Sequence, residues 1–121
     1  MPDQIGIAPT PIVPDGLVAF VKKDCPTCTL IAAVLRDLAA AGPAFRVVTQ
    51  DDPAFPAGVA AVVDDRSLDH SFLHGIEYTP TLIRFAAGRE VERTIGWDAG
   101  EWRRITGIAG LGAGLPPFQP G

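Results

Sequence analysis

The segment LVAFVKKDCPTCTLIAAVLRDL, residues 17–38, decides the fold, because it joins an apolar strand to a helix through two closely spaced cysteines. Its first five residues, 17–21, form a continuous apolar run that is typical of a central strand buried on both faces. Pro26 fits the first helical turn, where a missing N–H costs nothing. Gly42 and Pro43 are expected to end this helix. Its apolar stripe consists of Leu30, Ile31, Val34, Leu35 and Leu38.

The next elements give the fold its mixed character. Residues 45–49 (FRVVT) indicate a second strand, parallel to the first across a βαβ unit. Residues 81–85 (TLIRF) and 91–95 (VERTI) flank a turn at 87–89, and this close spacing predicts an antiparallel hairpin. We therefore expect an α/β fold of three layers, in which a βαβ unit, a variable middle and a ββα unit build a central mixed sheet.

The middle and the start of the chain are less regular. Residues 57–63 fit either a short strand or a helical turn, because prolines and a glycine interrupt their surroundings. Residues 67–74 predict a short helix with Ser67 as its candidate cap. Near the start, the prolines leave room for at most a short strand at 5–7.

The end of the chain predicts a last helix followed by a loose segment. Asp98 and Glu101 have the spacing of a capping box, which places a helix start there. Glycine and proline crowd residues 107–121, and we interpret this segment as an unpacked tail or linker. The domain is thus predicted to cover residues 1–106, with its core at 17–106.

Composition limits the class of protein. The 121 residues are enough for one domain, and 47% are hydrophobic against 20% charged, which excludes disorder throughout. The net charge is −4, and no basic cluster exceeds Lys22 and Lys23, so neither nucleic acid nor an anionic membrane is an expected partner. No segment predicts a membrane span, and the first residues do not read as a signal peptide. We expect a cytoplasmic monomer.

Cys25 and Cys28 are the only cysteines, and they form a CPTC motif. They lie between a buried strand and the first turn of a helix, where backbone N–H groups and the helix dipole favour a negative charge on Cys25. Because a thiolate is the nucleophile of disulfide exchange, a redox cysteine is expected at this position. Lys23, Asp24 and Pro26 are the neighbours predicted to modulate its ionisation; Lys23 favours the thiolate and Asp24 opposes it.

Three other interpretations of the cysteine pair stay open. A structural disulfide would close a very short loop and would limit the unfolded chain little. A zinc site would need His70 and His74, which lie one helical turn apart, but a long stretch separates them from Cys28. Two inert thiols in the core are less compatible with a proline between them at a helix start.

A second motif lies where Tyr78, Thr79 and Pro80 directly precede the strand at 81–85. Proline is tolerated there, because the first residue of a strand need not donate a hydrogen bond. Together with CPTC, this motif resembles the thioredoxin fold family, and the resemblance covers residues 17–105. The order strand, CxxC, helix and strand, followed by proline, strand, turn, strand and helix, agrees with that family.

The resemblance also implies roles for single residues. Pro80 would have a cis peptide bond and pack against the CxxC, and the backbone of Thr79 would hydrogen-bond an incoming substrate strand. Gly96 matches the family's glycine in the loop beside the active site. Trp97 would add an apolar wall to the substrate groove, although an aromatic residue at this position is equally suited to core packing.

The sequence departs from the family pattern at several positions. Asp24 stands where thioredoxins proper have a tryptophan, and Ala19 stands where they bury an aspartate that assists deprotonation of the second cysteine. The CPTC motif is nearer to the glutaredoxin pattern than to the CGPC of thioredoxins. Residues 95–102 (IGWDAGEW), however, lack the Gly-Gly-Asp-like glutathione site of glutaredoxins.

We therefore expect a thiol–disulfide oxidoreductase in which Cys25 attacks a substrate protein disulfide and Cys28 resolves the adduct. A cytoplasmic address favours the reducing direction, with an electron-donating reductase as second partner and no cofactor beyond the redox-active disulfide. One alternative is a non-catalytic thioredoxin-like adaptor that binds through the groove beside Pro80 and Trp97. Another is a metal site, whose ligands would be Cys25, Cys28, His70 and His74.

Overall fold

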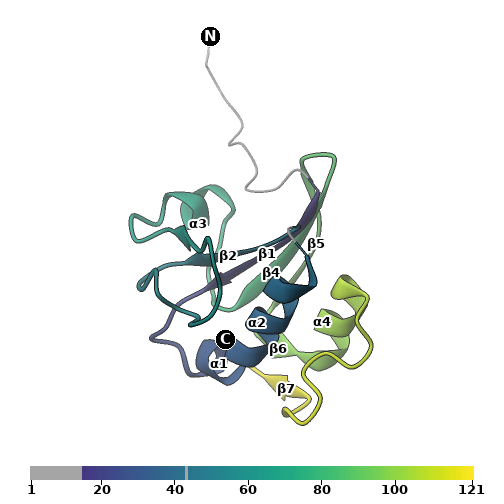
Figure 1. Ribbon diagram of the computed structural model, residues 1–121. Coiled ribbons are helices and arrows are strands. Elements are labelled where there is room, and N and C mark those ends of the chain that lie inside the picture. The colour runs from purple at the N-terminus through teal and green to yellow at the C-terminus, as the bar shows by residue number, and fades with distance from the viewer. Residues whose placement is uncertain (1–14, 43) are drawn as a thin grey trace.

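The centre of the computed structural model, which describes residues 15–42 and 44–121, is a five-stranded mixed sheet (Figure 1). Its strands are β1 (Gly16–Val21), β2 (Phe45–Thr49), β3 (Val63–Asp64), β4 (Thr81–Ala86) and β5 (Arg89–Ile95). They lie in the order β3-β2-β1-β4-β5. β1 pairs in parallel with β2, β2 in parallel with β3, and β4 antiparallel with both β1 and β5. The predicted α/β class and mixed sheet are confirmed.

The helix after β1 is divided near its start. α1 spans Pro26–Leu30 and α2 spans Ala32–Ala41, with Ile31 between them at φ −97° and ψ 14°. The sequence predicts one continuous helix, and backbone hydrogen bonds do connect α1 and α2 through Ile31. The N–H of Ile31 donates to Thr27 O, and the N–H of Leu35 donates to Ile31 O, each at 3.1 Å. Four residues of the predicted stripe are buried, namely Ile31, Val34, Leu35 and Leu38.

The short helix α3 spans Asp69–Leu73 and is capped by a carboxylate rather than by a hydroxyl. The buried Asp65 accepts the backbone N–H of His70 and of Ser71, each at 2.9 Å. The prediction of Ser67 as the cap is wrong, because the Asp65 carboxylate reaches the N–H groups that a cap would satisfy.

The last helix begins as the sequence predicts. α4 spans Ala99–Thr106, and the Asp98 carboxylate accepts the N–H of Glu101 at 3.1 Å. The ambiguous residues 57–63 lie mostly in turns, and β3 begins only at the last of them. The strand expected at 5–7 lies outside the described residues. Within residues 15–42 and 44–121, no helix is long and apolar enough to cross a membrane.

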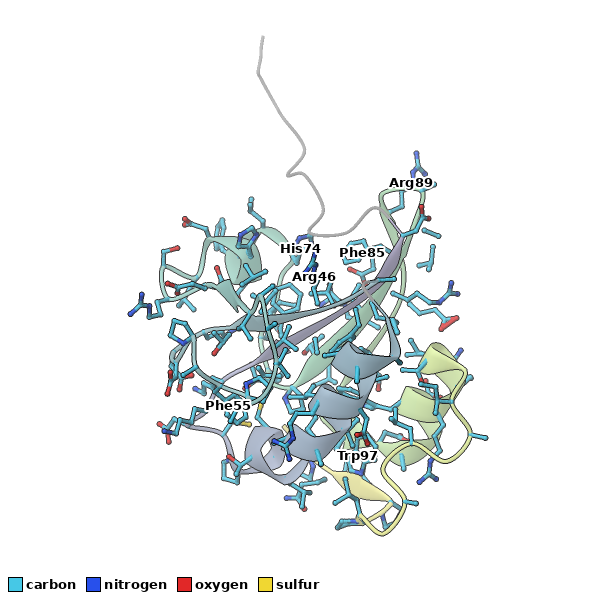
Figure 2. All side chains as sticks on the ribbon, in the orientation of Figure 1. Arg46, Phe55, His74, Phe85, Arg89 and Trp97 are labelled. Carbon is cyan, nitrogen blue, oxygen red and sulfur yellow. The ribbon has the colours of Figure 1, made fainter. Side chains whose placement is uncertain are left out.

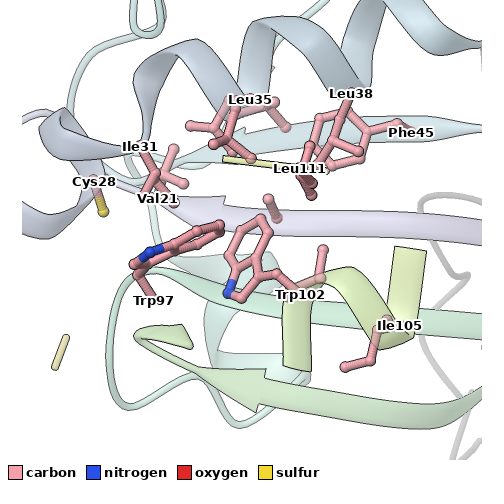
Figure 3. Packing of buried hydrophobic residues seen from close by; sticks show 14 of the residues in the cluster. Val21, Cys28, Ile31, Leu35, Leu38, Phe45, Trp97, Trp102, Ile105 and Leu111 are labelled. Atoms are coloured by element: carbon pink, nitrogen blue, oxygen red, sulfur yellow. The ribbon is translucent and has the colours of Figure 1, made fainter. Parts of the chain in front are cut away.

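Two apolar clusters cover the two faces of the sheet. On one face, α2 lies against β2 and α4 against β5, and the apolar cluster there includes both tryptophans, Trp97 and Trp102 (Figure 3). On the other face, the ring of His74 packs beside Phe85, with ring centroids 5.5 Å apart (Figure 2). The ring of Phe20 also lies beside His74, with its centroid 5.8 Å away. The sheet therefore has helical layers on both sides, which is the arrangement of three layers that the element order predicts.

Residues 107–121 pack against the rest of the domain, so the prediction of an unpacked tail is wrong. β7 (Phe118–Gln119) pairs antiparallel with β6 (Trp97–Asp98), as the yellow end of the ribbon shows (Figure 1). Leu111 is buried in the main cluster, and the indole N–H of Trp97 donates to Pro116 O at 2.7 Å. The glycines and prolines here shape turns around apolar contacts, which composition alone does not reveal.

The strand directions bring the candidate residues to one edge of the sheet. β4 runs antiparallel to β1, so the chain after β1 meets the chain before β4. β5 runs antiparallel to β4 and therefore ends at the same edge, where the N–H of Gly96 donates to Pro80 O at 2.7 Å. The loop after β2 reaches this edge too, because β2 is parallel to β1. The CPTC motif and the Thr79–Pro80 motif are thus neighbours.

Candidate functional site

The two cysteines lie at the start of α1 and differ in their surroundings. Cys25 is the N-cap of α1, and its sulfur accepts the backbone N–H of Cys28 at 3.3 Å. The Cys25 thiol donates to Thr79 O at 3.4 Å. Cys25 is 7% exposed and Cys28 is fully buried, and both are free thiols. The outer sulfur is therefore the one placed to meet a substrate.

Cys28 belongs to the apolar core, beside Val21 and Ile31 (Figure 3). Burial, reinforced by the neighbouring Cys25, raises its pKa from the ordinary value of 9.0 to about 12. The backbone of Lys22 and the side chain of Thr79 act in the opposite direction but are outweighed. None of these groups is a carboxylate, and Ala19 is itself buried in the same cluster. The Cys28 thiol thus keeps its proton at neutral pH.

Thr79 and Pro80 form the second side of the site. Both are buried, and the peptide bond between them is cis. Thr79 presents its carbonyl oxygen to the Cys25 thiol, and Pro80 presents its carbonyl oxygen to the N–H of Gly96. The structure therefore brings Cys25, Cys28, Thr79, Pro80 and Gly96 together, as the two sequence motifs predict.

A carboxylate that the sequence analysis did not single out holds the loop before Cys25. Asp51, in the loop after β2, accepts the backbone N–H of Lys23 at 2.7 Å and of Asp24 at 2.9 Å. Partial burial raises the pKa of Asp51, but these two N–H donors outweigh it and leave the pKa below its ordinary value of 3.8. The signal available in sequence was the position of Asp51 directly after a strand parallel to β1.

Lys23, Asp24 and Pro26, the residues predicted to modulate the Cys25 thiol, lie in different surroundings. The Lys23 ammonium lies 3.6 Å from the Asp52 carboxylate, and its side chain is largely exposed. Asp24 is exposed beside the cysteine, and Pro26 occupies the first turn of α1. The Lys23 ammonium therefore has the Asp52 carboxylate as its ion partner.

A groove of about 510 Å³ opens beside Cys25 on the side of α3. Its walls include Leu68 and Phe72 from the α3 region and Tyr78 from the loop before Thr79. Leu68 is 46% exposed, Phe72 84% and Tyr78 54%, so this side presents apolar surface to solvent. The sequence analysis did not identify these residues as candidates, since exposed apolar side chains carry no spacing signal of their own.

The base of this groove is fixed by a chain of hydrogen bonds. The side-chain amide of Gln50 donates to Ser71 Oγ at 2.9 Å. The Ser71 hydroxyl donates in turn to the buried Asp65 carboxylate at 2.6 Å. The same carboxylate caps α3, so it holds the helix and the groove wall together.

Comparison with solved structures identifies the fold. Mitochondrial thioredoxin 3 of Saccharomyces cerevisiae, in its oxidized form, is 19% identical with a TM-score of 0.54, and the match covers 80% of this chain and 81% of that chain. The thioredoxin of Malassezia sympodialis is 19% identical with a TM-score of 0.49, covering 80% of each chain. The chain has a thioredoxin-like fold. No protein-family model matches the sequence, and neither does any curated protein.

Within this thioredoxin-like fold, Trp97 does not have the place that the resemblance implies. Its side chain is fully buried, and its ring packs against Trp102 with centroids 5.4 Å apart (Figure 3). The predicted role of Trp97 as a wall of an open groove is therefore wrong, because residues 107–121 cover it. Gly96, at φ +75°, is covered as well: a Cβ there would lie 3.0 Å from Gln119 O.

The two histidines lie apart from the two cysteines. His74 lies against the far face of the sheet, where burial lowers its pKa and where its Nε2 has no hydrogen-bond partner. Among the described residues, no group of three or more histidine, cysteine, aspartate or glutamate side chains is arranged to hold a metal ion. All four proposed ligands are described residues, and the structure does not bring Cys25, Cys28, His70 and His74 together in one cluster.

Proposed function

We propose that the protein is a thiol–disulfide oxidoreductase that acts on protein disulfides through Cys25 and Cys28. The observation that carries this proposal is the position of the Cys25 sulfur. It caps α1, accepts the N–H of Cys28 and lies against Thr79 O, beside Pro80. The backbone N–H of Cys28 is thus directed at the sulfur that would act as the nucleophile in disulfide exchange.

In the first step, the Cys25 thiolate attacks one sulfur of the substrate disulfide. A Cys25–substrate disulfide forms, the substrate S–S bond breaks, and the electron pair leaves with the second substrate sulfur as a thiolate. In the second step, the Cys28 thiolate attacks Cys25 Sγ and releases the other substrate sulfur. The substrate is reduced by two electrons, and Cys25 and Cys28 become a disulfide.

Deprotonation of Cys28 is the demanding part of this sequence. Its pKa is raised to about 12, and the groups that act most on it include no carboxylate. The thiolate that leaves the substrate in the first step is a base formed close to the site, and it accepts a proton as the pair of reactions proceeds. Resolution is therefore expected to be slower than the initial attack at neutral pH.

The reducing direction is the one we propose, in a cytoplasmic setting, with a separate electron-donating reductase to return the Cys25–Cys28 disulfide to the dithiol. Thiol pools in that compartment keep such pairs reduced. Thr79, Pro80 and Gly96 would position the substrate strand, and the pair needs no other cofactor. Oxidation of substrates is the opposite outcome and is decided by the reduction potential.

A non-catalytic docking module is the second candidate, and one observation favours it. Leu68, Phe72 and Tyr78 leave apolar surface exposed around the groove, which is typical of a surface that meets another protein. In that case Cys25 and Cys28 would have no turnover, and the groove would serve for binding alone.

The decisive experiment is to trap the mixed disulfide. Cys28→Ser protein is incubated with insulin, a disulfide-bonded polypeptide, and analysed by non-reducing electrophoresis and mass spectrometry. We expect a covalent adduct through Cys25 that dithiothreitol releases. Cys25→Ser protein is the matched control and should give no adduct. Equal adduct formation by both variants, or by neither, would contradict the assigned roles.

The direction is tested by equilibrating the pair against glutathione or dithiothreitol. A potential near about −270 mV, where thioredoxin lies, supports a reductase, and one near about −120 mV indicates an oxidant. Absence of any reversible couple would refute the enzyme and favour the docking module.

A further inference from the structure

Residues 118–121, here called the strap, lie across the site on the side of Gly96. Gln119 pairs with Trp97 and Phe118 with Asp98, so the strap starts as a strand. The hydroxyl of Thr27, inside the CPTC motif, then donates to Pro120 O at 2.6 Å. Segments far apart in the sequence are thereby joined next to the nucleophile, and the end of the ribbon lies beside α1 (Figure 1).

The backbone of the strap lies directly against the backbone at Thr79 and Gly96, so a side chain at either glycine of this contact would not fit. A Cβ on Gly121 would lie 2.7 Å from Thr79 O, a distance that real Cβ atoms do not adopt. A Cβ on Gly96 would lie 3.0 Å from Gln119 O and from the N of Gly121. Glycine is thus needed at both Gly96 and Gly121 for the strap to keep this position.

The strap and the nucleophile share one carbonyl group. Thr79 O accepts the Cys25 thiol at 3.4 Å and is also the atom that a Cβ on Gly121 would meet first. Cys25 and Gly121 both line the groove, and Cys25 is only 7% exposed. The approach to the Cys25 sulfur from the Gly96 side is therefore closed by the chain itself.

We propose that the strap occupies the binding site of an extended substrate strand beside Cys25, and that a substrate must displace it. The contacts to the strap are made to its main chain. Trp97 pairs with it as a strand, the Thr27 hydroxyl donates to one of its carbonyls, and Thr79 O lies close to its last glycine. A partner that fits it is an extended peptide with a small residue opposite Thr79. The claim about substrates rests on the proposed function, whereas the closure of Cys25 does not.

Alkylation of Cys25 by iodoacetamide measures this closure without any redox turnover. Thr27→Val removes the hydroxyl that holds Pro120 while keeping the side-chain shape, and Gly121→Val forces a Cβ against Thr79 O. Loss of one hydrogen bond corresponds to about a two- to tenfold larger population of the open strap. We expect the alkylation rate of Cys25 to rise by that factor for Thr27→Val, and at least as much for Gly121→Val.

The matched control is Gly110→Val, because Gly110 has no atom within 4 Å of its Cβ position. Its alkylation rate should equal that of the unsubstituted protein. Equal rates for all four proteins would overturn the proposal, since Cys25 would then be reached through the α3 side without movement of the strap. Circular dichroism and an unfolding curve identify any variant whose faster reaction reflects unfolding.

A second measurement uses the strap without substitutions in it. Cys28→Ser protein is trapped as a mixed disulfide with an extended cysteine-containing peptide, and hydrogen exchange is followed in residues 118–121. Faster exchange than in the free protein supports displacement, and unchanged exchange opposes it. If no adduct forms, the proposed enzyme fails while the alkylation rates still decide whether the strap closes Cys25.

Discussion

The two sides of Cys25 are built in opposite ways. On the Gly96 side, Trp97 is fully buried, and β7 pairs with Trp97 and Asp98. On the α3 side, Phe72 and Tyr78 are exposed along a groove. The motifs locate the reactive atoms, whereas the covering segments decide from which direction those atoms are reached.

The closed side has the character of a core. Both indole N–H groups are satisfied inside the protein: Trp97 donates to Pro116 O at 2.7 Å and Trp102 to Gly96 O at 2.9 Å. Buried tryptophans need such partners, so the carbonyls of a distant segment stabilise the ring positions. Substitutions on this side are therefore expected to lower the free energy of unfolding more than substitutions on the open side.

Trp97→Ala is expected to have the largest effect on the closed side. Removing a fully buried indole leaves a cavity between α2 and residues 107–121 and frees the Pro116 carbonyl. We expect the free energy of unfolding to fall by about 3–5 kcal/mol, measured by urea denaturation of the dithiol form. A loss under about 1 kcal/mol would mean that the ring is not part of the core.

Asp65→Ala tests the support of the open side. The carboxylate is fully buried and accepts two backbone N–H groups and the Ser71 hydroxyl. We expect a loss of about 2–3 kcal/mol in the free energy of unfolding, with faster hydrogen exchange in α3. Ser71→Ala is the matched comparison: it removes one of the three bonds to the carboxylate together with the bond from the Gln50 amide, and should cost about 1 kcal/mol. Equal losses for both variants would contradict a capping role for the carboxylate.

The sequence predicts the parts of the fold that depend on local patterns. The apolar run of β1, the cap at Asp98 and the hairpin of β4 and β5 are each encoded within a few residues. The neighbourhood of Cys25 and Pro80 also follows from strand directions alone, because a βαβ unit and a following antiparallel strand bring both to one edge.

Other features depend on distant partners and could not be predicted in this way. Residues 107–121 look like a linker by composition, yet their contacts are to Trp97 and Thr27, far away in sequence. The same applies to Trp97, for which groove wall and core were equally compatible with an aromatic side chain. Ser67 and Asp65 both lie within reach of the start of α3, and only the backbone path selects Asp65.

Cys28 is fully buried beneath Cys25, and its ionisation makes the stability of the fold depend on pH. Its pKa is raised from 9.0 to about 12 in the folded dithiol form, so the unfolded chain loses this proton first as pH rises. The contribution of Cys28 to the free energy of unfolding is therefore fully present below pH 9 and is lost as the pH rises from 9 to 12. The slope is about 1.4 kcal/mol per pH unit, measured by urea unfolding in reductant. Cys28→Ala should abolish this slope, and its persistence would assign the effect to other groups.

Phe72→Ala is the mildest change and tests the open side directly. The ring is 84% exposed, so its removal creates no cavity, and we expect the free energy of unfolding to change by less than about 0.5 kcal/mol. The alkylation rate of Cys25 should also stay the same, because the strap and not Phe72 covers the sulfur. A clear loss of stability would show that the ring is packed in solution. A faster alkylation would show that the α3 side also shields Cys25, and the contrast between the two sides would then be one of degree.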